Sequence, residues 1–242
     1  GLVGSEMCIE TGNDFVTQLV GGTLPDHAFR FYLGQDARYL QDYAKALAGL
    51  ATRTDAVDET TYWSYSAYSS QVEEAELHRT WLAGEPAIAP SPVTQAYTNF
   101  LLASVFVDDY VVGAAAVLPC YWLYAQTGAQ ITRIPDEHPY AAWLHTYHDD
   151  EFAQATAQAL AIVERAFALA APQARSRAAR AYLTACRHEV EFFDQALRVD
   201  PDDPGATSDP TLGFGRGAQL TRHSPNRPPS HNTMTTHSRD DH

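Results

Sequence analysis

The segment around Cys120 places a thiol where it could act as a nucleophile. Pro119 precedes it within an apolar stretch of helical periodicity, and a proline inside a helix kinks or splits it. Such a kink gives the next residue room to face a cavity, and Tyr124 follows one turn later on the same side. A thiol becomes a useful nucleophile when neighbours stabilise its thiolate or accept its proton. The alternative is a small buried side chain in a well-packed helix.

Two carboxylates could supply the other groups that such a reaction needs. Asp36 lies in an apolar, aromatic stretch with Tyr39, where a carboxylate is costly to bury unless it is hydrogen-bonded. It could accept hydrogen bonds from a ligand, or it could link two helices. Glu189 lies three and four residues before Phe192 and Phe193. Apolar rings disfavour the charged form of a carboxylate, which suits a general acid or base near neutral pH.

Metal chemistry has one candidate pair in the sequence. Glu74 and His78 are four residues apart, a spacing that lets two ligands on a helix face one ion. A di-iron bundle needs further carboxylates and a repeated Glu-x-x-His pattern, and we cannot assemble these from the sequence. We therefore predict no metal site from this pair, and we interpret it as structural or surface-exposed.

The elements that must position these residues are helices almost throughout. Ser91 before Pro92 is a typical helix start, and the acidic residues at 149–151 favour another. We find no alternating strand pattern and no fixed repeat, which predicts an all-α bundle of about seven to eight helices. Helices are expected over about 25–47, 58–82, 92–105 and 109–127, in a short segment from 138, in a long one from 149, and over 172–197.

The two ends of the chain differ from its middle. Residues 1–11 have no clear helical pattern, and we interpret them as a foreign or truncated leader. From Pro201 onward the chain holds six of its fourteen prolines and no tyrosine or tryptophan. Such a segment buries too little apolar surface to offset its ordering entropy. We expect a folded domain over 12–199 and a disordered polar, proline-rich tail over 200–242.

The net charge of −14 argues against several classes of partner. Nucleic-acid binding needs a basic face, and an acidic chain is not attracted to an anionic membrane surface. No apolar run reaches the ~18 residues that a membrane span needs. Cys8, Cys120 and Cys186 are odd in number and widely spaced, which does not indicate a disulfide framework. We expect free thiols and a cytoplasmic protein.

Several separated segments, taken together and in order, resemble the TenA (thiaminase II) family in its cysteine-containing branch. The resemblance runs from about Phe15 to Ala196. Asn13-Asp14 stands where the family often has a His-Pro pair. The matching segments are FVTQL at 15–19 with GTL at 22–24, FYLGQD at 31–36, ELH at 76–78, SP at 91–92 with AYT at 96–98, LPCYW at 118–122, HPY at 138–140 and RHE at 187–189.

This resemblance implies a haem-oxygenase-like helical bundle, assembled as a homotetramer without cofactor or metal. It implies hydrolysis of the exocyclic C–N bond of aminomethylpyrimidine or thiamin, which gives hydroxymethylpyrimidine for thiamin salvage. By position, Cys120 would be the nucleophile and Glu189 the acid/base. Asp36 would hold the ring nitrogen and amino group of the pyrimidine. The residues expected around the ring are Tyr39, Tyr97, Tyr147 and Phe192, with Tyr124 orienting polar partners.

Two other functions are open from the sequence. A non-catalytic pyrimidine-binding or regulatory protein could use the same fold, although the presence of Cys120 together with Glu189 favours the enzyme. An oxidase or oxygenase would require metal ligands that face the core. The choice between thiamin and aminomethylpyrimidine depends on the room beyond the leaving group. Loop geometry sets that room, so the sequence leaves this choice open.

Overall fold

The computed structural model describes residues 13–83, 87–131, 133–200 and 203–207, without the side chains of 73, 74, 76–78 and 203–207. The described chain is almost entirely helical, so the prediction of an all-α fold is confirmed. The leader over 1–11 and most of the expected tail lie outside these residues. The elements are α1 (Asp14–Val20), α2 (Asp26–Ala51), α3 (Val57–Trp81), α4 (Pro92–Phe106), α5 (Tyr110–Gln130), α6 (Ala141–Tyr147), α7 (Asp150–Leu169), α8 (Pro172–Leu197), β1 (Val199–Asp200) and β2 (Asp203–Thr207).

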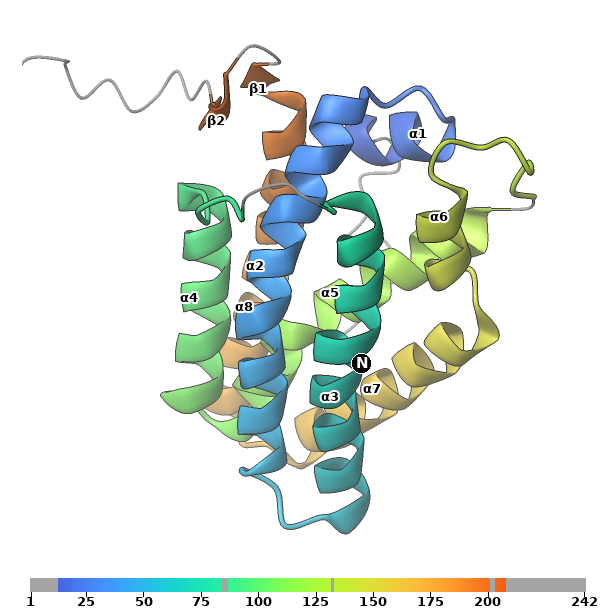
Figure 1. The fold of residues 1–242 in the computed structure, drawn as a ribbon. Coiled ribbons are helices and arrows are strands. Elements are labelled where there is room, and N and C mark those ends of the chain that lie inside the picture. Colours follow the sequence, from blue (N-terminus) through green and yellow to red (C-terminus); the bar gives the residue numbers. More distant parts are fainter. Residues whose placement is uncertain (1–12, 84–86, 132, 201–202, 208–242) are drawn as a thin grey trace, which may run out of the picture. The chain divides into compact units, whose positions relative to one another are not determined.

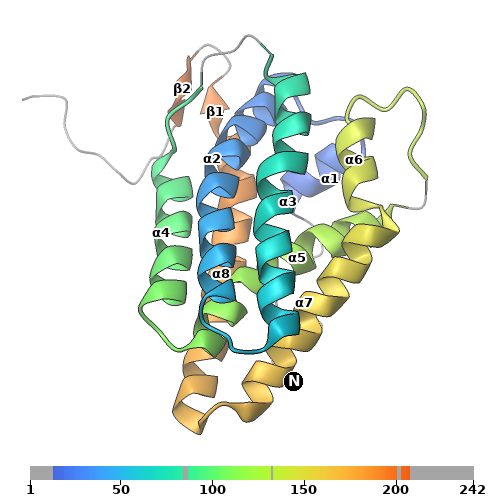
Figure 2. The same cartoon turned by 60° about the horizontal axis from the view of Figure 1, so that its bottom comes forward.

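Helix α2 lies between α3 and α4, and α5 and α8 pack behind it (Figures 1 and 2). Helix α7 packs on α5, and the short helix α6 contacts both α5 and α7. Helices α2, α4, α5 and α8, which carry most of the candidate residues, therefore pack against one another. None of the described helices is long and apolar enough to cross a membrane.

Two helix starts follow the expected capping signals. Ser91 accepts a hydrogen bond from the backbone N–H of Thr94, and Asp149 accepts one from that of Glu151. These side-chain oxygens satisfy backbone donors that a helix start leaves open. Helix α1 was not among the expected elements, because it is a single short segment of seven residues. Asn13 caps it and also donates to Asp194 on α8 at 2.8 Å, so this departure from the family pattern joins two helices.

Three boundaries differ from the sequence prediction. Helix α5 continues past Gly128 to Gln130, and α6 begins at Ala141 rather than at 138. The later start of α6 has a local cause, because the ring of His138 accepts from the backbone N–H of Tyr140 and holds a turn there. Strands β1 and β2 form a small antiparallel hairpin with Val199 opposite Thr207. This hairpin reaches into the segment that the sequence assigned to the tail.

The cysteines also differ from the expectation. Cys120 is a free thiol, as predicted. Cys186 is buried on α8 and takes part in a disulfide. The prediction of free thiols is therefore wrong for Cys186, because cysteine spacing alone does not show which thiols the fold brings together.

A buried polar cluster joins the helices that carry the candidate site. We call Gln35, Ser91, Thr94 and Gln195 the interhelical cluster; each is less than a tenth exposed. Gln35 Oε1 accepts from the Ser91 backbone N–H at 2.9 Å and from the Thr94 hydroxyl at 2.7 Å. Gln195 Oε1 accepts from the Ser91 hydroxyl at 2.6 Å. The cluster thus fixes α2, the start of α4 and α8 relative to one another.

Replacing Gln35 by Leu should lower the free energy of unfolding by about 1–3 kcal/mol, because the two donors that it satisfies would be left buried without an acceptor. Urea denaturation monitored by circular dichroism measures this loss. The matched control is Gln158→Leu on the exposed face of α7, which should change stability by less than ~0.5 kcal/mol. Equal effects of the two changes would show that the interhelical cluster does not stabilise the fold.

Candidate active site

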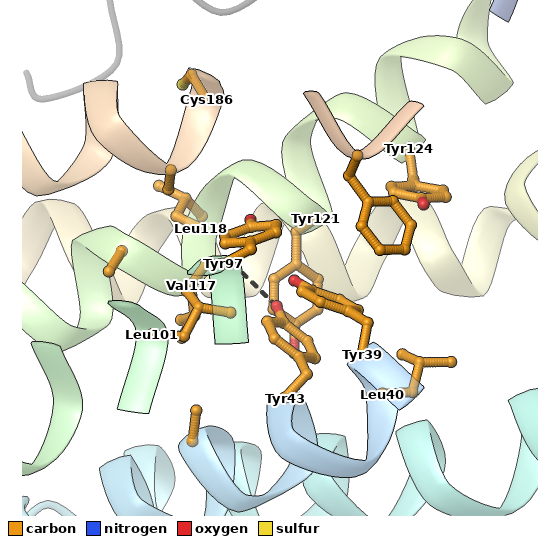
Figure 3. Packing of buried hydrophobic residues seen from close by; sticks show 14 of the residues in the cluster. Tyr39, Leu40, Tyr43, Tyr97, Leu101, Val117, Leu118, Tyr121, Tyr124 and Cys186 are labelled. Carbon is orange, nitrogen blue, oxygen red and sulfur yellow. Dashed lines mark hydrogen bonds between the residues drawn. The ribbon is translucent and has the colours of Figure 1, made fainter. Parts of the chain in front are cut away.

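Cys120 lies on α5 directly after Pro119, and part of its surface is accessible while Pro119 and Tyr121 are buried. The sequence predicted a kink or break at the proline, but the structure shows one continuous helix from Tyr110 to Gln130. A backbone carbonyl near the proline is used by a neighbour, as the hydroxyl of Tyr43 donates to the Val117 oxygen at 2.9 Å (Figure 3). The rings of Tyr39, Tyr43 and Tyr97 gather at this part of α5.

The surroundings of the thiol favour its protonated form. Burial is the main cause that raises the pKa of Cys120 well above its ordinary value, and the charge of Glu189 raises it further. The charge of Asp36 also raises the pKa of Cys120, whereas the hydroxyls of Tyr39 and Tyr43 lower it. A thiol with a raised pKa is a poor nucleophile at rest. Activation of the Cys120 thiol must therefore be coupled to substrate binding or to removal of the thiol proton.

Glu189 on α8 is a buried carboxyl held by one strong donor. It is 1% exposed, and the hydroxyl of Tyr97 donates to its Oε1 at 2.5 Å. Burial raises the pKa of Glu189 to about 8, the hydrogen bond from Tyr97 lowers it, and the charge of Asp36 raises it. Most Glu189 carboxyls are therefore protonated at neutral pH. This is the protonation state that a general acid needs before the reaction.

Asp36 lies between the thiol, the acid and a second group of rings. It is buried on α2, and its charge raises the pKa values of Cys120, Glu189 and Tyr124. Coulomb interactions weaken with distance, so Asp36 lies within electrostatic reach of Cys120, Glu189 and Tyr124.

Aromatic rings enclose this group on two sides. Next to the thiol, the ring of Tyr39 lies 5.0 Å from Tyr97 and 5.4 Å from Phe192, measured between centroids. Farther along α5, the ring of Tyr124 lies 4.6 Å from Tyr147. Both sides are connected through Tyr32, whose hydroxyl is hydrogen-bonded to that of Tyr124 at 2.7 Å and whose ring lies 5.9 Å from Phe192. All eight residues proposed from the sequence therefore belong to one connected cluster.

The sequence analysis assigned no role in the site to three further members of the cluster, namely Tyr32, Tyr43 and Trp143. Tyr32 and Tyr43 follow a pattern with Asp36 and Tyr39, because the four lie four, three and four residues apart on one face of α2. That spacing could have found them. Trp143 carries no such signal, because α6 is short and its placement on α5 is tertiary.

Tyr147 is the last residue of α6 rather than a loop residue, and α5 holds it in place. A Cβ atom added to Gly128 would overlap the carbonyl oxygen of Tyr147 and lie 2.6 Å from its carbonyl carbon. The ring Nδ1 of His148 lies 3.0 Å from the Gly128 oxygen. A glycine at this position lets the backbones of α5 and α6 touch, and this contact brings the ring of Tyr147 against Tyr124.

The structure shows no metal-binding cluster in the chain it describes, in the sense of three or more His, Cys, Asp or Glu side chains around one point. The side chains of Glu74 and His78 lie outside the described residues. The interpretation of Glu74 and His78 as a structural or surface-exposed pair stays a prediction.

The sequence profile of the TENA/THI-4/PQQC family matches residues 13–199. The chain belongs to this family. Among curated members, the thiamine biosynthesis multifunctional protein ThiED of Corynebacterium glutamicum is 49% identical over 187 residues, which cover 77% of this chain and 24% of that protein. The chain thus spans about a quarter of the length of this relative. The aminopyrimidine aminohydrolase of Bacillus subtilis is 28% identical, with 77% of this chain and 82% of that protein covered.

Solved structures of the family share the fold. A TenA family transcription regulator from Silicibacter superposes with a TM-score of 0.70 at 26% identity, covering 76% of this chain and 88% of that one. A domain of unknown function with a heme oxygenase-like fold from Shewanella denitrificans gives a TM-score of 0.58 at 12% identity, covering 77% and 84%. The second likeness concerns the fold alone, and it confirms the haem-oxygenase-like architecture.

Gly128→Ala should lower the free energy of unfolding by about 1–3 kcal/mol, because the added methyl group overlaps backbone atoms of α6. Thermal or urea unfolding measures this loss of stability. The cost of the overlap exceeds the ~1 kcal/mol by which alanine is more favourable than glycine in a helix. The matched control is Gly34→Ala in α2, where the new Cβ meets only the end of the Ile88 side chain. That side chain can rotate away, so the control should be neutral or stabilising. A stabilised Gly128→Ala variant would contradict the backbone contact.

Glu189→Gln should stabilise the protein by a few kcal/mol above pH ~8 and by much less near pH ~4, since each pKa unit corresponds to about 1.4 kcal/mol. The folded state holds the Glu189 proton up to a pKa of about 8, whereas the ordinary value is 4.5. Stability of the native protein therefore falls as pH rises between these values, and glutamine removes this loss. Urea midpoints over this pH range measure the difference.

The control for this titration is Glu191→Gln on the same helix, where the carboxylate is exposed beside Arg198. It should show no comparable dependence on pH. If both variants gave the same pH profile, a buried protonated Glu189 would be the wrong description.

Proposed function

We propose that the protein is an aminopyrimidine aminohydrolase that cleaves the exocyclic C–N bond of aminomethylpyrimidine or thiamin. The product is hydroxymethylpyrimidine, which re-enters thiamin synthesis. The observation that carries the proposal is the arrangement of a buried Glu189 of raised pKa beside the Cys120 thiol and Asp36. The activity named for the Bacillus subtilis relative and the thiamine role named for ThiED support it.

The enclosure suits a flat, polar ring. An aminopyrimidine presents two faces that pack against aromatic side chains. The ring centroid of Tyr39 lies 5.0 Å from that of Tyr97 and 5.4 Å from that of Phe192. Asp36 is a buried acceptor that can take hydrogen bonds from the amino group and a protonated ring nitrogen.

The proposed reaction uses Cys120 to interrupt the aromaticity of the ring. The sulfur bonds to an electron-poor ring carbon, and the thiol proton passes to the ring nitrogen that this attack makes basic. Protonated Glu189 then gives its proton to the departing amine, leaving a double bond to the exocyclic carbon. Water adds to that carbon and returns a proton to Glu189. The ring nitrogen gives back its proton as the C–S bond breaks, so the thiol and the acid are both regenerated.

Transfer of the thiol proton to the substrate agrees with the raised pKa of Cys120. A free thiolate would be repelled by the charge of Asp36, and by Glu189 once that carboxyl has lost its proton, whereas a neutral thiol is not. The ring nitrogen becomes basic only as the C–S bond forms, so proton loss and attack occur together. The same observation favours the second candidate, a pyrimidine-binding or regulatory protein without turnover, because the thiol is unreactive at rest. Turnover by the native chain decides between them.

We extend the proposal to a cytoplasmic homotetramer. Tyr65, Tyr68 and Val72 on α3 are exposed by 63%, 60% and 45%, and exposed apolar surface of this kind favours self-association. A catalytic free thiol favours a reducing compartment, whereas the disulfide at Cys186 favours an oxidising one.

The deciding assay measures release of ammonia and hydroxymethylpyrimidine from aminomethylpyrimidine, with thiamin as a second substrate. The native chain should turn over at least one of them. Cys120→Ala should lose at least ~1,000-fold in kcat because it removes the nucleophile, and Glu189→Gln at least ~100-fold because it removes the acid. Tyr182→Phe, which changes a buried hydroxyl outside the cluster, should retain activity. No turnover by the folded native chain on either substrate would leave the binding protein as the function.

A further inference from the structure

Four buried side-chain polar atoms of the described chain make no hydrogen bond: the hydroxyls of Tyr39, Ser69 and Tyr182 and the indole N–H of Trp143. A buried donor without an acceptor destabilises a fold, so most native donors are satisfied. Two of the four, Tyr39 and Trp143, belong to the aromatic enclosure of the candidate site. The hydroxyl of Tyr39 lies beside Cys120, whereas Trp143 has no role in the reaction described above.

Trp143 is packed into the far side of the enclosure. It is 1% exposed, and its ring centroid lies 4.5 Å from Tyr147 and 5.8 Å from Tyr124. The hydroxyl of Tyr124 is itself engaged with that of Tyr32. The indole ring thus packs against two residues that are proposed to bind the pyrimidine, and its N–H donates to neither of them.

A second buried tryptophan shows how this fold treats an indole that is only structural. Trp63 on α3 is 0% exposed, and its Nε1 donates to the Tyr110 hydroxyl at 2.9 Å. That hydroxyl in turn donates to Glu59 at 2.7 Å. The fold therefore supplies an acceptor for one fully buried indole and withholds it from the other, which lies in the candidate site.

We propose that Trp143 is a ligand-binding residue whose indole N–H donates a hydrogen bond to an acceptor atom of the bound pyrimidine. The inference rests on the proposed function for the class of ligand. An indole N–H is a donor only, so its partner is an unprotonated ring nitrogen or an oxygen substituent, not the amino group. An aminopyrimidine carries both an amino group and unprotonated ring nitrogens. Asp36 can accept a hydrogen bond from the amino group, and Trp143 can donate one to a ring nitrogen.

The direct test follows the indole resonances of the whole 242-residue chain labelled with ¹⁵N. The chain has four tryptophans, so it gives four indole N–H signals, which Trp143→Phe and Trp63→Phe assign by loss. Hydroxymethylpyrimidine, the proposed product, is added to saturation. The ¹H resonance of the Trp143 indole should move downfield as its hydrogen bond forms, while that of Trp63 stays in place. A Trp143 signal that does not shift downfield at saturation overturns the inference.

Affinity gives an independent measure on the same variants. Trp143→Phe should raise the Kd for hydroxymethylpyrimidine and the KM for aminomethylpyrimidine by about three- to tenfold, because one hydrogen bond to the ligand is lost. Trp63→Phe makes the same truncation outside the site, so it should leave Kd and KM unchanged. It should nevertheless lower the Tm more than Trp143→Phe does, since it also breaks a satisfied hydrogen bond. An unchanged Kd in Trp143→Phe contradicts the inference.

Failure of the inference and failure of the proposed function give different results. Turnover by the native chain with a stationary Trp143 resonance retains the hydrolase and removes the role of Trp143. Binding that shifts this resonance without any turnover supports Trp143 as a ligand residue and removes the hydrolase. A native chain that neither binds hydroxymethylpyrimidine nor releases ammonia overturns both.

Discussion

The hydroxyl of Tyr97 on α4 donates a hydrogen bond to the Glu189 carboxyl on α8 and so links these two helices. The other site residues are arranged around this hydrogen bond. Glu189 is buried, so its proton is retained near neutral pH. Tyr97 holds the carboxyl in one position while its ring packs against Tyr39. The interhelical cluster fixes α4 against α2 and α8 only one turn from Tyr97, so the geometry of the acid depends on a polar contact outside the site.

Several groups in this site are held in states that oppose stability. Glu189 keeps a proton that the unfolded chain would release, Cys120 is held as a neutral thiol, and the indole N–H of Trp143 has no acceptor. A second buried indole, that of Trp63, does have an acceptor. Unfavourable groups that gather in one enclosure indicate a surface prepared for a ligand, because a ligand can supply the missing partners when it binds.

Helix positions followed closely from local signals, since Ser91 with Pro92 and the acidic residues at 149–151 start helices where capping rules place them. The candidate residues also came from the sequence, through the family motifs and the polar groups in apolar stretches. Tyr32 and Tyr43 were within reach of helical spacing. Trp143 was not, because its place in the site depends on how α6 packs on α5.

By itself, the sequence determined the all-α class, most of the helix ends, the acidic net charge and the types of side chain available for catalysis. These properties depend on neighbours within one or two helical turns and on composition. The sequence also predicted the direction of the Glu189 pKa shift, but only the tertiary structure decided the raised pKa of Cys120, the bond between Tyr97 and Glu189, and the backbone contact at Gly128. Burial and charge proximity arise when α2, α4, α5 and α8 pack together, and no local pattern specifies the distances between them.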